Sequence, residues 1–227
     1  MSVMSGTTIS LFGPNRTGEF AGRALHFKSG NRIKAAVCSI PGNLAQLLVT
    51  LVMGCAALFY VESPFQQIGL KTETVLTWIF ILVLVLISIY ASLSFLRKRM
   101  GLTSIFGTVK SYIEPVFTYS NSILLKVLLW SFLRYLVFST QFYLMLVACG
   151  VQVQWFDAFA SIAVVYLFMA VIPGFAIAEF TLRGSVALFL LAPLTANATG
   201  VLAASAALWL VNLVVPALIG GAAIYSI

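Results

Sequence analysis

The stretch AFASIAVVYLFMAVIPGFAIAEFTLRGSVALFLLA, residues 158–192, decides how this chain folds. It is apolar on both sides of a break at Pro173 and Gly174, and each side is shorter than the roughly 20 apolar residues that a helix needs to cross a bilayer. Non-helical backbone is tolerated at membrane depth only where protein or a water-filled cavity surrounds it. The pattern therefore predicts a re-entrant hairpin, in which two half-length helices enter the membrane and return to the same face.

The composition of the whole chain places this hairpin in a membrane. Of the 227 residues, 61% are apolar and only 8% are charged, and the mean hydropathy is +1.06. Soluble domains carry roughly 25% charged residues. We therefore expect an all-α fold, a polytopic helical membrane protein that forms a single membrane domain over residues 1–227. Long charge-free runs predict about four full transmembrane helices, at residues 36–60, 75–96, 124–149 and 200–226.

The basic residues predict the orientation of these helices. The net charge is +7, and the lysines and arginines concentrate in residues 16–34 and 97–126, whereas residues 62–73 and 150–157 hold few bases. Cytoplasmic loops of membrane proteins carry an excess of lysine and arginine. The first two segments are therefore expected in the cytoplasm and the other two outside, and no nucleic-acid partner is indicated. Residues 101–113 have the apolar spacing of an amphipathic helix on the cytoplasmic surface.

A charged motif of the hairpin occurs twice in the chain. EFTLR at 179–183 and EFAGR at 19–23 both place glutamate, phenylalanine and arginine at positions i, i+1 and i+4, and the first copy follows Pro14 and Gly18. We expect a first re-entrant hairpin that enters from the cytoplasmic side, opposite to the second. Broken helices at corresponding positions of two inverted halves mark the binding site of many transporters. The parts of the domain are then residues 1–34 (first hairpin and basic segment), 35–149 (three spans) and 150–227 (second hairpin and last span).

The predicted site lies where the two hairpins meet. A half-helix that begins at membrane depth presents unpaired N–H groups and a positive dipole end, which suit an anionic group such as a phosphate. A glutamate and an arginine four residues apart can also pair with each other, so each pair could instead be a local ion pair that holds its hairpin to neighbouring helices. The side chains predicted to line this cavity are Glu19, Arg23, Arg134, Glu179 and Arg183.

Arg134 lies inside the third predicted span, and two orientations stay open for it. It could extend to the cytoplasmic interface, or it could reach inward to Glu179 or to a lipid phosphate. The other polar residues within the spans, Gln141 and Asn212 among them, are typical of contacts between helices.

No catalytic, metal-ligand or cofactor-binding constellation is evident in the sequence. Cys38, Cys55 and Cys149 lie within or at the ends of apolar runs without CxxC spacing, so they indicate packing rather than a disulfide or a metal site. We therefore predict no cofactor and no enzymatic activity.

Two blocks of the sequence resemble a known family. GPNRTGEFAGRAL (13–25) is similar to the first block of the lysylphosphatidylglycerol synthase transmembrane family, and VIPGFAIAEFTLRGSVALFLL (171–191) with AASAALWLVNLVVPALIGG (203–221) is similar to the second. This flippase-like family includes the membrane half of the bacterial multiple peptide resistance factor. The matching residues are Pro14, Gly18 and Glu19 in the first block and Pro173, Gly174, Glu179 and the VVPALIGG ending in the second. Phe175 and Ile177 depart from the usual pattern.

The resemblance implies a multi-pass protein of the bacterial inner membrane that translocates a lipid between leaflets, either an anionic phospholipid or a polyprenyl-phosphate-linked lipid. Aminoacyl transfer belongs to a separate soluble domain of the synthase, and no such domain is expected here, so the resemblance does not imply a transferase. Family members usually have one or more spans ahead of the first block. The chain is therefore expected to be a truncated or late-starting member, or to have an unusually short first half-helix.

Two other functions fit the same sequence features. One is a transporter or channel for a small solute. The other is a non-transporting membrane subunit of a lipid-modifying or glycosyl-transfer enzyme, in which residues 101–113 would bind a soluble transferase. The oligomeric state is not indicated by the sequence.

Overall fold

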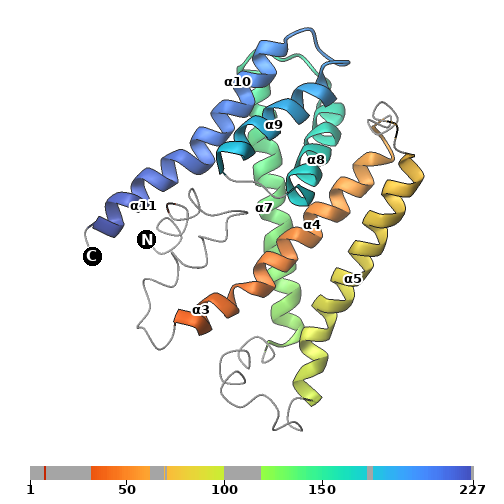
Figure 1. Cartoon of the computed structure of the whole chain (residues 1–227), viewed down its shortest axis with the longest axis vertical. Helices are drawn as coiled ribbons and strands as arrows, with labels where there is room; N and C mark the ends of the chain where they lie inside the picture. The colour runs from red at the N-terminus through yellow and green to blue at the C-terminus, as the bar shows by residue number, and fades with distance from the viewer. Residues whose placement is uncertain are drawn as a thin grey trace.

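The computed structural model describes residues 8, 32–61, 69, 71–99, 119–172 and 176–225, and these residues form helices and short connections (Figure 1). No strand occurs in the described ranges. The all-α class is therefore confirmed for this part of the chain. The helices are α3 (Arg32–Cys38), α4 (Ile40–Leu58), α5 (Thr72–Arg99), α7 (Asn121–Ala148), α8 (Trp155–Val171), α9 (Ala176–Leu191), α10 (Ala198–Trp209), the π-helical turn η6 (Leu210–Val214) and α11 (Val215–Tyr225).

Three helical stretches are long and apolar enough to cross a membrane. They are Ala36–Leu58, Asn121–Ala148 and Ala198–Ala222, and they coincide with three of the four predicted spans. The remaining predicted span, 75–96, lies within α5, whose described apolar part is the shorter stretch Leu76–Ser92. The chain is thus compatible with a membrane protein, and the fourth full span stays a prediction.

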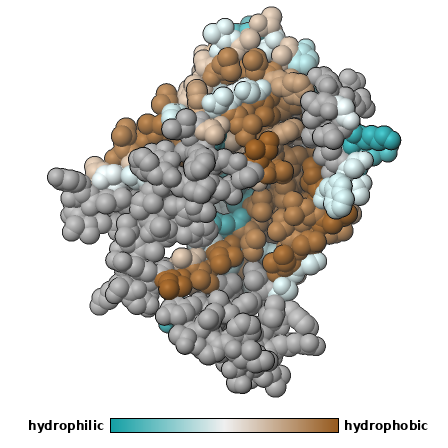
Figure 2. Space-filling model, viewed as in Figure 1, coloured by the Kyte–Doolittle hydropathy of each residue, from teal (hydrophilic) through white to brown (hydrophobic). Residues whose placement is uncertain are grey.

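The outside of the helix bundle is apolar. Figure 2 shows hydrophobic (brown) side chains over much of the described surface, with few hydrophilic ones between them. Trp78 on α5, Trp130 and Val137 on α7, and Leu218 on α11 are 65% to 70% exposed. Water-soluble monomers rarely expose contiguous apolar patches of more than a few hundred Å². Lipid is the solvent that suits such a surface.

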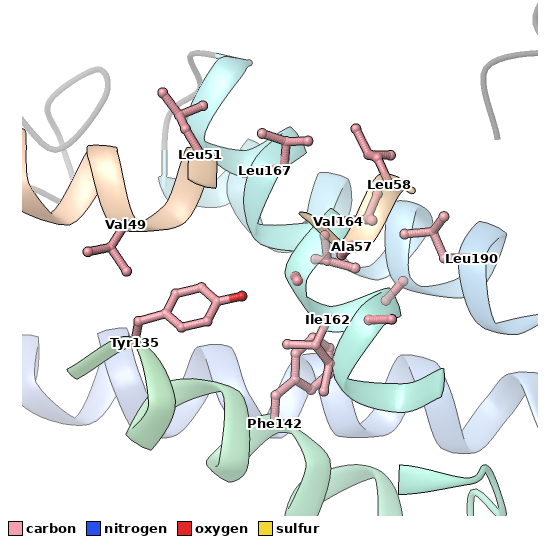
Figure 3. Packing of buried hydrophobic residues seen from close by; sticks show 14 of the residues in the cluster. Val49, Leu51, Ala57, Leu58, Tyr135, Phe142, Ile162, Val164, Leu167 and Leu190 are labelled. Atoms are coloured by element: carbon pink, nitrogen blue, oxygen red, sulfur yellow. The ribbon is translucent and has the colours of Figure 1, made fainter. Parts of the chain in front are cut away.

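The core lies where α4, α7 and α8 meet. Figure 3 shows Phe142 of α7 beside Ile162 of α8, and Leu51 of α4 near Leu167 of α8. These four side chains are at most 2% exposed. The closest approach is at Gly54 of α4, where an added Cβ atom would lie 2.6 Å from the Leu167 Cβ atom. Small residues allow such close approach, which helix association in a membrane depends on.

The α8–α9 pair begins and ends at the same end of the bundle. The Asn197 side-chain amide donates hydrogen bonds to the carbonyl oxygens of Cys149 (3.1 Å) and Gly150 (3.2 Å). Its oxygen accepts a hydrogen bond from the Gly200 N–H at 2.9 Å and so caps α10. Gly150 has a φ of +74°, which favours glycine at this turn. Because the start of α10 is tied to the end of α7, the intervening pair, whose helices pack together, must return to where it began.

Residues 16–34 and 97–126 are predicted to be cytoplasmic. Their described parts lie at the end of the bundle opposite to Asn197. In Figure 1, α3, the C-terminal end of α5 and the first turn of α7 lie toward the bottom, whereas α8 and α10 begin at the top. This grouping agrees with the charge pattern, and the side of the membrane that each end faces stays a prediction. The amphipathic stretch 101–113 lies outside the described residues.

The helix that follows Asn197 is interrupted by a π-helical turn. In η6 the N–H of Val215 donates to the carbonyl oxygen of Leu210, five residues earlier. Pro216 follows directly, and a proline in a helix has no N–H to donate and clashes with the carbonyl group four residues before it, here that of Asn212. The wider turn gives that carbonyl group room.

Candidate functional site

The candidate site begins with an ion pair in the first turns of α9. The Arg183 Nη2 atom donates to the Glu179 Oε1 atom at 2.5 Å, one helical turn away. The pairing that the spacing predicts is therefore present. The side chains of Glu179 and Arg183 are only 13% and 9% exposed, although the protein exposes many large apolar side chains elsewhere. Two charges are thus sheltered inside an apolar bundle.

The helix that carries this pair, α9, packs against both α8 and α10. The Phe180 ring packs on the Trp209 ring of α10, with ring centres 5.4 Å apart. One turn further on, Gly184 faces Leu202 of α10, and an added Cβ atom would lie 3.4 Å from its Cδ2 atom. Removing one member of a buried ion pair typically costs about 3–5 kcal/mol, because the other charge stays buried. Loss of either charge is therefore expected to be costly.

The chemistry of this arrangement suits an anion. Glu179 lies in the first turn of α9, where a helix favours negative charge. The planar guanidinium group of Arg183 offers several N–H donors in a geometry that matches carboxylate and phosphate oxygens. A phosphate group could replace the carboxylate of Glu179 as the partner of Arg183 without changing the type of bond.

Arg134 lies in a different environment, midway along α7. Its side chain is exposed, and its guanidinium carbon lies 5.3 Å from the centre of the Phe138 ring, one turn further along the helix. This is a cation–π contact. Glu179 forms an ion pair with Arg183, and the two orientations of Arg134 considered from the sequence stay predictions.

A polar contact between distant helices was not predicted from the sequence. The Asn212 side-chain amide in η6 donates to the Gln141 Oε1 atom of α7 at 3.0 Å. The sequence predicts only that each of these amides contacts another helix, without naming its partner. The sequence feature that indicates such a contact is that each residue is an amide within a largely apolar span, where hydrogen-bond partners are scarce.

A second unpredicted contact joins α4 to α8. The Tyr60 hydroxyl donates to the Asp157 Oδ1 atom at 2.9 Å. This hydrogen bond is the main reason that the pKa of Tyr60 is raised, followed by partial burial and the negative charge of Asp157. The 97 residues between the two partners leave no local pattern that would predict this contact.

Thr8 contacts α11. Thr8, which belongs to the predicted first hairpin, donates its hydroxyl hydrogen to the carbonyl oxygen of Ala217 at 2.7 Å. An added Cβ atom on Gly221 would lie 3.6 Å from the Thr8 Cγ2 atom. The remaining predicted site residues of the two hairpins lie outside the described residues: Pro14, Gly18, Glu19, Arg23, Pro173 and Gly174.

No group of three histidine, cysteine or acidic side chains that could hold a metal ion occurs in the part of the chain that the structure describes. A scan against protein-family models and searches of curated proteins and of solved structures found no match to this chain. The resemblance to the lysylphosphatidylglycerol synthase transmembrane family therefore stays a prediction from the sequence blocks.

Proposed function

We propose that this chain is a flippase-like protein of the bacterial inner membrane, which binds the phosphate of a phospholipid or a polyprenyl-phosphate-linked lipid and moves that lipid between leaflets. The observation that carries the proposal is the sheltered ion pair of Glu179 and Arg183 in an otherwise apolar bundle. Charged side chains inside membrane proteins are costly, and they mark substrate or ion pathways.

The architecture in this proposal uses α8 and α9 as a re-entrant hairpin. The two helices have 17 and 16 residues, which gives each a length of about 25 Å at 1.5 Å per residue. A bilayer core is about 30 Å thick. The hydrogen bonds of Asn197 to Cys149 and Gly150 support a return to the starting face. The EFAGR copy at 19–23 would supply the inverted partner, and the Thr8–Ala217 bond is consistent with contact between the two halves.

In the proposed mechanism, Glu179 keeps Arg183 neutralised until a lipid arrives. The lipid phosphate then accepts hydrogen bonds from the Arg183 guanidinium group, and the carboxylate is displaced to a more exposed position. Charge-assisted hydrogen bonds of this type are stronger than those between neutral groups. Glu19 and Arg23 would act similarly from the other face, and Arg134, midway along α7, would attract the headgroup along its path.

The test is a leaflet-resolved assay in proteoliposomes. A fluorescent phospholipid is incorporated, a membrane-impermeant reductant bleaches the outer leaflet, and the second phase of bleaching reports movement between leaflets. A hydrogen bond to a charged group contributes about 1.5–3 kcal/mol, so Arg183→Gln is expected to slow this phase by about tenfold to about a hundredfold. Arg183→Lys keeps the charge without the planar geometry and should retain part of the rate.

Lys126→Gln is the matched control, because Lys126 is an exposed cation in the second turn of α7. Its rate should equal that of the wild type. A rate for Arg183→Gln equal to the wild-type rate, with an unchanged circular dichroism spectrum, would contradict the proposal. Uptake of a water-soluble solute without lipid movement would instead identify a solute transporter. Binding of a soluble transferase by a chain that moves no lipid would identify a membrane subunit.

A further inference from the structure

Four exposed aromatic residues lie together at one end of the bundle. Phe59 and Tyr60 directly follow α4, and Trp155 and Phe156 begin α8. Their side chains are 79%, 53%, 61% and 45% exposed, respectively. The Tyr60 and Phe156 rings meet edge to face with centres 4.6 Å apart, and the Trp155 and Phe156 rings do so at 5.6 Å. We call these four residues the aromatic corner.

The aromatic corner is held in place by the polar contact described above. The hydrogen bond from Tyr60 to Asp157 ties the segment after α4 to the first turn of α8. Tyr60 therefore has its ring against Phe156 and its hydroxyl group on a carboxylate. A side chain with an apolar ring and a polar tip is enriched where one end must be apolar and the other wet.

The corner also borders the apolar band of the bundle. α5 packs against α4 and exposes large apolar side chains along its described length, and Trp78 near its first turns is 68% exposed. The corner lies at the end of the bundle where α4 ends and α5 begins (Figure 1). A lipid bilayer covers both features at once, with acyl chains against the band and headgroups at its rim.

We propose that the aromatic corner binds the boundary between headgroups and acyl chains of one leaflet, the outer leaflet if the charge pattern sets the topology. This inference depends on the membrane location of the chain and not on lipid transport. The partner of the corner is a lipid surface, and not a second copy of the chain or water.

The position of the corner also limits how far the ion pair can lie from the membrane surface that the corner binds. α9 ends at Leu191. The Asn197 side chain, which bonds the backbone at the end of α7, lies at the same end of the bundle. At 1.5 Å per residue, Arg183 and Glu179 lie at most about 12 Å and about 18 Å along the helix axis from Leu191. Half the thickness of a bilayer core is about 15 Å. The ion pair therefore lies near the membrane centre or in the leaflet that the aromatic corner binds.

The test compares two single-tryptophan proteins, because the chain has four tryptophans. One keeps Trp155 and carries Trp78→Phe, Trp130→Phe and Trp209→Phe. The other keeps Trp130, which is 70% exposed on α7 and lies well inside the helix, and it carries phenylalanine at the other three positions. Both are reconstituted in phosphatidylcholine vesicles whose acyl chains carry bromine either near the glycerol or near the chain end.

Bromine near the glycerol is expected to quench Trp155 fluorescence about twofold more than bromine near the chain end, as for an interfacial indole, and Trp130 is expected to show the reverse order. Stronger quenching of Trp155 by the deep bromines would overturn the proposal. Quenching of Trp155 by aqueous iodide but by neither lipid would also overturn it, because the corner would then face water. Protection of Trp155 from all quenchers, relieved when the protein-to-lipid ratio is lowered, would show a second copy as the partner and overturn it too.

Discussion

Replacing Gly54 by alanine is expected to force α4 and α8 apart. The Cβ atom of an alanine at this position would lie 2.6 Å from the Leu167 Cβ atom and 3.1 Å from the Leu167 Cγ and Cδ1 atoms. Two carbon atoms attract best at about 3.5–4.0 Å, so the nearest pair is too close by about 1 Å. A Cβ atom cannot rotate away, because the backbone fixes its position. The two helices must therefore shift.

The size of the effect follows from two opposing contributions. Overpacking a core by one methyl group costs about 1–3 kcal/mol. Alanine favours a helix over glycine by about 1 kcal/mol, which offsets part of this cost. Gly54→Ala should therefore change the free energy of unfolding by about 0–2 kcal/mol in the destabilising direction. Gly42→Ala on the same helix gains the helix preference alone, because an added Cβ atom there has nothing within 4 Å.

The assay is reversible unfolding in mixed micelles of dodecyl maltoside and sodium dodecyl sulfate, followed by circular dichroism. The difference between the two variants isolates the contact with Leu167 and should be about 1–3 kcal/mol. Leu167→Ala in the Gly54→Ala background should not restore stability, because the Leu167 Cβ atom stays in place. Equal stability of Gly54→Ala and Gly42→Ala would refute the close packing of α4 on α8.

Two further contacts give predictions in the same assay. Asn197→Ala removes the hydrogen bonds to Cys149, Gly150 and Gly200 and should lower the free energy of unfolding by about 1–3 kcal/mol; it should also speed amide hydrogen exchange at residues 149–151, whereas Asn121→Ala at the exposed start of α7 should do neither. Asn212→Leu removes the bond to Gln141 and should cost about 0.6–1.7 kcal/mol. The double variant with Gln141→Leu should recover most of that loss, and strictly additive costs would show that the two amides do not interact.

The helices of this chain could be predicted closely from the sequence, because apolar runs and prolines are local signals. The apolar parts of residues 158–192 on either side of Pro173 and Gly174 predict two short helices, and the structure has Trp155–Val171 and Ala176–Leu191. Because α9 begins three residues before Glu179, the carboxylate lies within the first turn of the helix, one turn from Arg183. Had the helix begun at Glu179, the carboxylate would lie at the helix end instead.

The contacts between helices could not be predicted in the same way. Gln141 and Asn212 are 71 residues apart, and Tyr60 and Asp157 are 97 residues apart. Hydrophobic periodicity indicates which face of a helix is buried, but it does not indicate which helix covers that face. The orientation of Arg134 was left open for the same reason, although its contact with the Phe138 ring is local, because residues four apart share one face of α7.

The π-helical turn before Pro216 changes how the last helix faces its surroundings. Val201, Ala204 and Leu208 form a buried stripe on α10, and the stripe resumes at Leu213 and Ala217. A continuous α-helix would carry it through other positions, which are in fact 44% to 48% exposed: Val211, Val215 and Ile219. One additional residue in the turn rotates everything after it by about 100°. A helical wheel drawn straight through residues 198–225 would therefore misplace the exposed and buried sides of α11 by about 100°.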